Sequence, residues 1–320
     1  MKVDIIASSS VIPQRELARG TQLLCSLGFE VRSAVNATSQ HFAFSGSDRE
    51  RTDALLEAVY SDSDLLWAAR GGYGAGHLLP ELAAATRNRR PPLKLLVGYS
   101  DVTALYQLAI RDWGWQVLHA PMLCSDNFQR ASDSNRSALL ALLRTGRDEL
   151  LAEQPLNWHH CIGRSVTAPL FGGNLAVICS LIGTPWQLDF SGKLLFLEEI
   201  GESWSKIDRM LQHLLLSGSL EGCQGIVLGQ FSACRDASPT GLTHSGEKVA
   251  LREVYTPAQA LELTVLPIAR QLGIPLVSGL QVGHDSQSLA LAMPGLYQLD
   301  ESRGLQLLDW AWQGRNISAT

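Results

Sequence analysis

The chain has 320 residues, of which 46% are hydrophobic and 18% are charged, and its formal net charge is −5. This length is enough for two domains of ordinary size, and the apolar fraction excludes wholesale disorder. The negative charge disfavours a general nucleic-acid binder, because such proteins usually carry a basic face.

The cysteines and the N-terminus contain neither a metal motif nor a targeting signal. The six cysteines, at positions 25, 124, 161, 179, 223 and 234, form no CxxC pair and have no zinc spacing. We expect reduced, mostly buried thiols. The apolar run at residues 3–7 is too short for a signal-peptide core, and no stretch approaches the ~18 apolar residues of a membrane helix. We therefore expect a cytoplasmic protein that does not enter a membrane.

The first half of the chain alternates short apolar runs with helical patterns. Strands are expected at residues 3–7, 28–31, 65–69 and 95–97, and helices at 14–27, 78–85 and 102–111. Another helix begins at the capping-box pattern Ser47-x-x-Glu50 and includes residues 54–59. Strands that alternate with helices predict an α/β domain with a doubly wound parallel sheet.

The second half is less regular. Residues 153–164, which include Pro155 and Trp158, are interpreted as the crossing between domains, so the expected domains are 1–155 and 165–320. Strands are expected at 193–197, 225–228 and 276–282, and a helix at 207–216. We therefore expect a smaller C-terminal domain of mixed strands and helices.

Polar residues that follow predicted strands are the candidates for chemistry, because ligands of open parallel sheets gather at the carboxyl ends of strands. These residues are Gly71 and Gly72, Ser100, Glu198 and His284. A serine hydroxyl needs a base to act as a nucleophile, and the base needs an orienting acid. The order Ser100, Glu198, His284 therefore suggests a serine hydrolase triad, with the glycine turn as a source of oxyanion N–H groups.

Each candidate also has an ordinary structural interpretation. Ser100 stands where a helix N-cap residue is common, and its segment lacks the second glycine of the G-x-S-x-G elbow. Glu198 could be an exposed turn acid, with Glu199 and Glu202 as rival carboxylates. His284 could be a hydrogen-bonded loop residue, and the other histidines, including His119 and His213, compete with it.

The glycine turn has two alternative interpretations. The series Gly72-x-Gly74-x-Gly76 after a strand is weakly similar to a phosphate or dinucleotide loop. However, its third glycine comes one position early, and Arg90-Pro91-Pro92-Leu93 stands where a ribose-binding acid is expected. The turn could also be tight without binding any ligand. We expect no nucleotide cofactor.

Together these segments resemble a known family. The chain is similar to the LD-carboxypeptidases, or muramoyltetrapeptide carboxypeptidases, a serine peptidase family that also includes the microcin C self-immunity proteins. The resemblance runs in order from about residue 3 to residue 300. It is carried by Arg70-Gly71-Gly72-Tyr73-Gly74, Gly98-Tyr99-Ser100-Asp101, Gly172-Gly173-Asn174-Leu175, Gly183-Thr184-Pro185-Trp186, Leu195-Phe196-Leu197-Glu198-Glu199, Ile207-Asp208-Arg209-Met210-Leu211, Gly229-Gln230-Phe231 and Gly283-His284.

The resemblance implies roles for individual residues. Ser100 would be the nucleophile, His284 the general base and Glu198 its orienting acid, in a site between the two domains. The N–H of Asp101, with that of Gly71 or Gly72, would form the oxyanion hole. The implied reaction releases the terminal D-Ala of murein tetrapeptide in peptidoglycan recycling, without a metal or another cofactor, in a homodimer.

A carboxypeptidase must also hold a free terminal carboxylate. Arg70 and Arg209 are candidates because a guanidinium can bind a carboxylate through two hydrogen bonds, although either could make a structural ion pair instead. Trp186 could line the pocket or belong to the core.

Two other functions stay open. One is an immunity-type hydrolase that cleaves an amide in a peptidyl nucleotide, for which an aromatic residue on a loop of the site would be evidence. The other is a non-catalytic peptide- or sugar-binding module, which would not need the full set of Ser, Glu and His.

Overall fold

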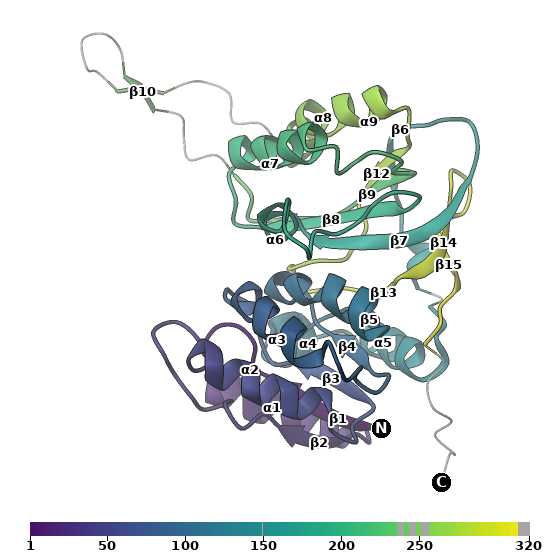
Figure 1. The fold of residues 1–320 in the computed structure, drawn as a ribbon. Coiled ribbons are helices and arrows are strands. Elements are labelled where there is room, and N and C mark those ends of the chain that lie inside the picture. Colours follow the sequence, from purple (N-terminus) through teal and green to yellow (C-terminus); the bar gives the residue numbers. More distant parts are fainter. Residues whose placement is uncertain (149, 236–239, 243–247, 251–255, 313–320) are drawn as a thin grey trace.

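Figure 1 shows the computed structural model, which describes residues 1–312 except 149, 236–239, 243–247 and 251–255. The molecule has a lower half built on one sheet and an upper half built on another. This two-domain α/β architecture agrees with the fold class expected from the sequence.

The sheet of the lower half has the strand order β13-β5-β4-β3-β1-β2. Its strands are β1 (Lys2–Ile6), β2 (Glu30–Ser33), β3 (Leu65–Ala68), β4 (Leu95–Val97), β5 (Gln116–His119) and β13 (Leu291–Met293). The first five are parallel, as a doubly wound sheet requires, but β5 was not among the strands expected from the sequence, and β13 pairs antiparallel with β5. A C-terminal segment of the chain therefore returns to complete the N-terminal sheet.

Strand β3 shows how this sheet is buried on both faces. Leu65 and Trp67 pack into one hydrophobic cluster, and Leu66 and Ala68 into the other, because successive side chains of a strand point to opposite faces. Helices cover both faces, which explains why the inner strands β3 and β4 are continuous apolar runs. These helices are α1 (Gln14–Ser26), α2 (Asp48–Val59), α3 (Leu79–Thr86), α4 (Asp126–Gln129), α5 (Asp133–Thr145) and the 3₁₀ and π segments η1 (Ala75–Leu78), η2 (Ser100–Leu105) and η3 (Leu108–Trp113).

The sheet of the upper half is mixed and has the order β15-β14-β7-β8-β9-β12-β6. Its central strands β7 (Val166–Asn174), β8 (Leu194–Ile200), β9 (Gly225–Ser232) and β12 (Leu276–Ser278) are parallel. The outer strands β6 (Asn157–His160) and β14 (Gly295–Asp300) pair antiparallel with them, and β15 (Gly304–Asp309) pairs antiparallel with β14. The helical segments of this half are η4 (Leu151–Glu153), α6 (Leu175–Ser180), α7 (Trp204–Leu216), α8 (Pro257–Thr264) and α9 (Leu266–Leu272), and a separate hairpin contains β10 (Thr240–Leu242) and β11 (Lys248–Ala250).

The structure refines three expectations about local structure. The helix expected at 102–111 is present, but it consists of the 3₁₀ segment η2 and the π segment η3, with two α-helical residues, 106–107, between them. The strand expected at 276–282 ends at Ser278, because Gly279 turns the chain with a φ of 95°. The presumed crossing at 153–164 contains β6, whose backbone is paired by β12. The exact domain boundaries stay a prediction.

Other expectations are easily compared with the structure. The Ser47–Glu50 capping box is present at the start of α2. All six cysteines are free, but only Cys179, Cys223 and Cys234 are buried, so the expectation of mostly buried thiols was half right. Among the helices that the structure describes, none is long and apolar enough to cross a membrane.

Candidate active site

Ser100 lies on the turn between β4 and η2, at the carboxyl end of the first sheet. It is the first residue of η2, and its φ of 60° is unusual for a residue other than glycine. The cap position belongs to Tyr99, and no side-chain capping hydrogen bond is present, so the N-cap interpretation of Ser100 was wrong. A strained backbone on a strand-to-helix turn is one way to present a reactive hydroxyl.

The glycine turn after β3 lies directly beside Ser100. A Cβ atom added to Gly71 would be 3.1 Å from Ser100 Oγ. Ser10 holds this turn in place, because its N–H donates to the Gly71 carbonyl at 3.3 Å and its Oγ accepts from Tyr73 N–H at 3.2 Å. Asp101 Oδ2 accepts from Ala75 N–H at 2.8 Å and so ties the two turns together. The oxyanion role of the N–H groups of Gly71, Gly72 and Asp101 stays a prediction.

Glu198 and His284 are hydrogen-bonded to each other. Glu198 lies near the end of β8 and is fully buried, and His284 follows Gly283 on a loop. Glu198 Oε2 accepts from His284 Nδ1 at 2.7 Å. Because an ionised carboxylate can only accept, the Nδ1 atom carries the proton in this pair. That leaves Nε2 of a neutral imidazole as the basic nitrogen, which is the arrangement a general base needs.

The two rival carboxylates have structural partners. Glu199 Oε atoms accept from Asn174 Nδ2, Ala176 N–H and Ile200 N–H at 2.8–3.0 Å. Burial is the main influence on this carboxyl group and raises the pKa of Glu199. Glu202 forms an ion pair with Lys206 at 3.0 Å. Glu199 therefore anchors the start of α6, and Glu198 is the acid that reaches a histidine.

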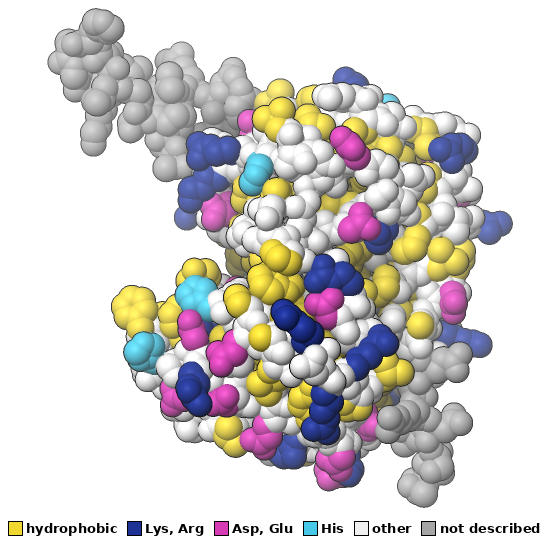
Figure 2. All heavy atoms as spheres, in the orientation of Figure 1, with side chains coloured by type: hydrophobic (Ala, Val, Ile, Leu, Met, Phe, Trp, Pro, Cys, Tyr) yellow, Lys and Arg dark blue, Asp and Glu magenta, His cyan; other side chains and the backbone are white. Residues whose placement is uncertain are grey.

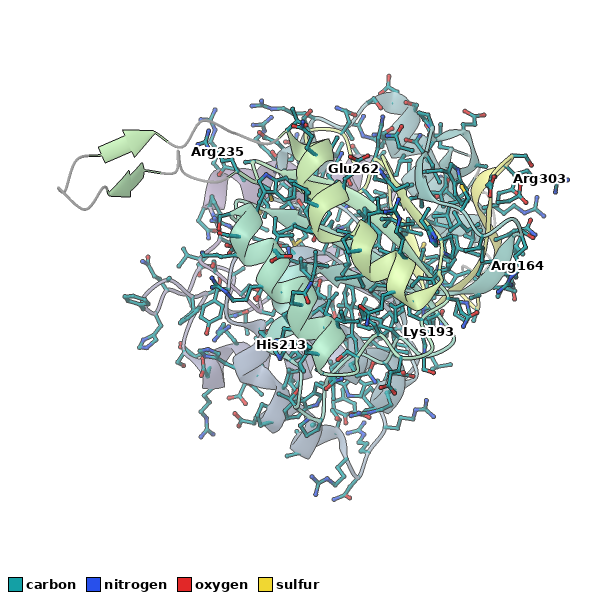
Figure 3. The ribbon with its side chains drawn as sticks, turned by 90° about the horizontal axis from the view of Figure 1, so that it is seen from above. Arg164, Lys193, His213, Arg235, Glu262 and Arg303 are labelled. Carbon is teal, nitrogen blue, oxygen red and sulfur yellow. The ribbon has the colours of Figure 1, made fainter. Side chains whose placement is uncertain are left out.

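The two named rival histidines are also placed elsewhere. His213 is exposed on α7, at the outside of the upper half (Figure 3). His119 is buried at the end of β5, and burial lowers its pKa to about 3, with a smaller contribution from His284. Tyr106 O–H donates to the Gly98 carbonyl at 2.7 Å, so its oxygen accepts from His119 Nδ1 at 3.1 Å. His119 is thus a neutral residue beneath the nucleophile turn.

An aromatic contact brings the two halves of the site together. The ring of Tyr99, which precedes Ser100, lies 4.6 Å from the ring of His284 between centroids. Within the part of the chain that the structure describes, no hydrogen bond joins Ser100 Oγ to His284. Catalytic hydrogen bonds are often long or poorly aligned in the absence of substrate, so a serine and a histidine can act together without being hydrogen-bonded in the free enzyme. The arrangement places a hydroxyl, an imidazole and a buried carboxylate around one junction.

The three predicted substrate-binding residues lie in different parts of the structure. Arg70 is exposed next to the glycine turn, and its Nη1 donates to the Val11 carbonyl at 3.1 Å. Arg209 is exposed on α7. Trp186 lines a groove with Arg87, Arg90 and Arg111. Arg111 lies on η3, eleven residues after Ser100 in the sequence. The binding roles of all three stay predictions.

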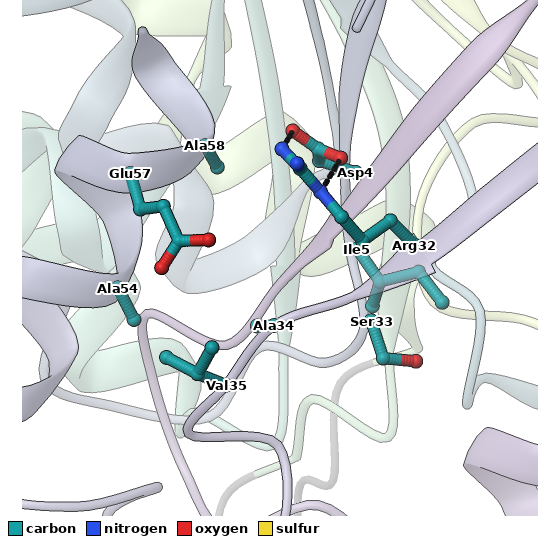
Figure 4. Close-up of a pocket in the computed structure, with 9 residues that line it drawn as sticks. All are labelled: Asp4, Ile5, Arg32, Ser33, Ala34, Val35, Ala54, Glu57 and Ala58. Atoms are coloured by element: carbon teal, nitrogen blue, oxygen red, sulfur yellow. Dashed lines mark hydrogen bonds and ion pairs between the residues drawn. The ribbon is translucent and has the colours of Figure 1, made fainter. Parts of the chain in front are cut away.

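The surface has two other concave features. In the space-filling view the surface is hollowed on one side between the two halves, and hydrophobic and histidine side chains gather on its lower lip (Figure 2). A separate pocket beside β1 has a volume of only about 10 Å³, room for about one water molecule. Figure 4 shows that the Asp4–Arg32 ion pair lies at this pocket, with nitrogen–oxygen distances of 2.7 and 2.8 Å. We therefore do not assign a ligand to it.

The sequence interpretation missed two polar residues that support the site. Ser10 follows β1 at the same sheet edge as Ser100, so the rule that found Ser100 could also have found it. Asn127, on α4, contacts the residues before both Ser100 and His284. No pattern in the sequence indicates it. Among the residues described, no cluster of three or more His, Cys, Asp or Glu side chains could hold a metal ion.

Comparison with known families covers most of the chain. Residues 3–120 match the LD-carboxypeptidase N-terminal domain, and residues 167–299 match the LD-carboxypeptidase C-terminal domain. A Rickettsia conorii protein is 32% identical over 216 residues, which cover 66% of this chain and 68% of that protein. The murein tetrapeptide carboxypeptidase of Pseudomonas aeruginosa is 28% identical over 298 residues, or 90% of each chain.

Solved structures show the same architecture. The muramoyltetrapeptide carboxypeptidase of Oxalobacter formigenes has a TM-score of 0.74 and 28% identity, and the match covers 97% of this chain and 99% of that one. The microcin C7 self-immunity protein in complex with aspartyl sulfamoyl adenosine has a TM-score of 0.76 and 20% identity, over 96% and 95% of the two chains. At that identity the second match shows the fold alone. The microcin C7 self-immunity protein of Escherichia coli is 24% identical to this chain over 252 residues.

Proposed function

The chain belongs to the LD-carboxypeptidase family, and on this premise we propose that it is a serine carboxypeptidase acting on murein tetrapeptide. The proposed substrate is L-Ala-γ-D-Glu-meso-diaminopimelate-D-Ala, which would lose its terminal D-Ala. The observation that carries the proposal is the hydrogen bond between Glu198 and His284, 2.7 Å long, beside the turn of Ser100. Homologues named murein tetrapeptide carboxypeptidase, at 28–29% identity over most of the chain, support the substrate class.

The proposed reaction has two steps. In the first, Ser100 Oγ attacks the carbonyl carbon of the diaminopimelate–D-Ala bond while His284 Nε2 accepts the hydroxyl proton. Glu198 holds the imidazole in the correct tautomer and stabilises the imidazolium that forms. His284 then gives the proton to the leaving amine of D-Ala. In the second step, water activated by His284 hydrolyses the acyl-enzyme and restores Ser100.

The glycine turn would supply the oxyanion hole. Gly71 lies against Ser100 Oγ, so its backbone and that of Gly72 are close to the carbon that would be attacked. The Asp101 N–H follows the nucleophile directly, as in other strand-to-helix turns of serine hydrolases. Each such donor is typically worth about 3–4 kcal/mol of transition-state stabilisation.

The test is incubation of the purified protein with the tetrapeptide and measurement of free D-Ala. We expect release by the wild type and loss of release in Ser100→Ala. Ser180→Ala is the matched control, because Ser180 is an exposed serine on α6 whose hydroxyl donates to the Val177 carbonyl. No release by the wild type would refute the carboxypeptidase function. Release by Ser100→Ala at the wild-type rate would refute the mechanism.

One observation favours a second candidate, an immunity-type amide hydrolase. Tyr73 lies on the glycine turn and is 62% exposed, and its ring is 5.8 Å from that of Phe44. An exposed aromatic ring on this loop could stack on a nucleobase. Aspartyl sulfamoyl adenosine, named in the complex of the microcin C7 protein, is a suitable probe. A higher kcat/KM for this compound than for the tetrapeptide would favour the second candidate.

We further propose that the enzyme acts in the cytoplasm, on imported wall fragments, and as a homodimer. The resemblance to the family supports both statements. Sedimentation equilibrium of the purified chain tests the second, with a mass of one chain as the contradicting result.

A further inference from the structure

Asn127 is a buried residue of the lower half that contacts the His284 loop of the upper half. It lies on α4 and is 2% exposed. Its Nδ2 group donates to the Gly283 carbonyl at 3.0 Å and to the Tyr99 hydroxyl oxygen at 3.2 Å. Gly283 precedes His284, and Tyr99 precedes Ser100. One side-chain amide therefore contacts the neighbours of the proposed nucleophile and of its base.

The orientation of this amide follows from its partners. A backbone carbonyl can only accept hydrogen bonds, so the NH₂ group of Asn127 must face Gly283. The opposite orientation would set two acceptor oxygens against each other. Asn127 Oδ1 is buried and has no hydrogen-bond partner among the described residues. A buried amide oxygen without a partner costs free energy, so an apolar side chain would fill this position at a lower cost. The two hydrogen bonds made by Nδ2 therefore point to a role for Asn127 other than packing.

Two other anchors of the His284 loop come from its own half, whereas Gln287, farther along the loop, accepts from Ser132 N–H at 3.0 Å and from Asn135 Nδ2 at 3.2 Å in the lower half. Gly283 N–H donates to Ser288 Oγ at 3.0 Å, and Asp285 N–H donates to Gln230 Oε1 at 2.9 Å. These bonds hold the loop relative to the upper sheet but not relative to Ser100. Asn127 spans the junction, and it also holds the Tyr99 hydroxyl, whose ring packs against the imidazole.

We propose that Asn127 is a positioning residue, which sets the placement of His284 relative to Ser100 by holding Gly283 and Tyr99 together. The inference rests on the proposed function, because that function assigns the roles of Ser100 and His284. Small displacements of reacting groups are costly, and about 1 Å can reduce a rate 100-fold. Loss of the clamp should therefore lower the rate of the chemical step and leave substrate binding nearly unchanged.

The test is Asn127→Leu, which keeps the approximate volume and removes both hydrogen bonds. The matched control is Thr86→Val, because Thr86 is also buried in the lower half and makes two hydrogen bonds, to Leu82 and Trp113. Three quantities are measured in each variant: kcat and KM for D-Ala release, the rate of Ser100 labelling by a small fluorophosphonate, and Tm. Tyr99→Phe removes one of the two clamp contacts and keeps the ring.

We expect Asn127→Leu to lower kcat and the labelling rate about 30-fold or more, with KM within 3-fold of wild type. Thr86→Val should lower Tm and leave both rates within 2-fold. Tyr99→Phe should lower kcat less than Asn127→Leu does, and the double variant should be no slower than Asn127→Leu. If Asn127→Leu does not fold, Asn127→Asp replaces it, because a carboxylate of the same shape cannot donate to Gly283 and should show the same loss.

Wild-type rates in a folded Asn127 variant, with only Tm lowered, would overturn the inference and leave a purely structural residue. The labelling readout separates this failure from that of the proposed function. A wild type that is labelled but releases no D-Ala refutes the substrate assignment alone, and the clamp is then judged by labelling. A wild type that shows neither reaction refutes the roles of Ser100 and His284, and the inference with them.

Discussion

Substitution of Gly71 by alanine tests whether the glycine turn must lie directly against Ser100. An added Cβ would be 3.0 Å from Ser100 Cβ, 3.1 Å from Ser100 Oγ and 3.1 Å from Met122 Cε. Met122 Cε is the end of a flexible side chain and can move away. Ser100 cannot move so easily, because its Cβ is attached to a backbone held at a φ of 60°. The strain therefore falls on the nucleophile.

The expected loss of rate follows from how far the added Cβ must push Ser100 to reach an ordinary van der Waals contact. Relief to an ordinary contact of 3.4 Å requires 3.4 − 3.0 = 0.4 Å of movement at Ser100 Cβ. If a displacement of about 1 Å costs about 100-fold in rate, or about 2.7 kcal/mol, then 0.4 Å costs about 1.1 kcal/mol. We expect kcat for D-Ala release to fall about 5- to 10-fold in Gly71→Ala.

Gly76 provides the control on the same segment. It lies in η1, and a Cβ added there would meet nothing within 4 Å. Gly76→Ala should therefore keep kcat within 2-fold of the wild type. Steady-state D-Ala release and fluorophosphonate labelling are measured for both variants. Equal rates for Gly71→Ala and Gly76→Ala would refute the reasoning, since they would show that nothing near Ser100 needs the space at Gly71.

Three further predictions concern catalysis, stability and pH. Glu198→Gln should lower kcat about 10³- to 10⁴-fold, because an amide can hold His284 in the wrong tautomer; a loss under 10-fold in D-Ala release would contradict the orienting role. Ser47→Ala removes the cap of α2 and should lower the free energy of unfolding in urea by about 1 kcal/mol, with kcat unchanged; an unchanged urea midpoint would contradict it. Burial lowers the pKa of His119 to about 3, below its usual value of about 6.5, so the unfolded chain binds one more proton between these values. As the pH falls from 6.5 towards 4, the free energy of unfolding of the wild type should therefore decrease relative to that of His119→Gln, by up to about 1.4 kcal/mol per pH unit. The measurement is urea unfolding of both proteins at several pH values, and the same pH dependence in both would contradict this prediction.

Local patterns predicted the strands β3 and β4 of the first sheet well because these strands are buried on both faces. Runs such as Leu65–Ala68 and Leu95–Val97 are apolar throughout, and helices with clear periodicity separate them. The failures occurred where tertiary contacts decide the structure. Strand β6 has no apolar alternation and exists because β12 pairs with it. The sequence pattern predicted a helix at 102–111 but not its 3₁₀ and π geometry in η2 and η3.

The choice between the adjacent acids Glu198 and Glu199 shows the same division. Both follow the apolar run of β8, so the position after a strand cannot separate them; the resemblance to the family favoured the first. The structure places them on opposite sides, because successive side chains of a strand alternate. Glu198 reaches His284, and Glu199 accepts from the N-terminus of α6.

By itself, the sequence determined the fold class, the family and the residue types at the carboxyl ends of the strands. These properties depend on composition, on short periodicities and on motifs that a few neighbouring residues carry. Only the tertiary structure decided which of these residues meet: Glu198 and His284 are 86 positions apart, and Asn127 and Gly283 are 156 positions apart. Such contacts depend on how two separately formed sheets are packed together, and no local property of either segment encodes that distance.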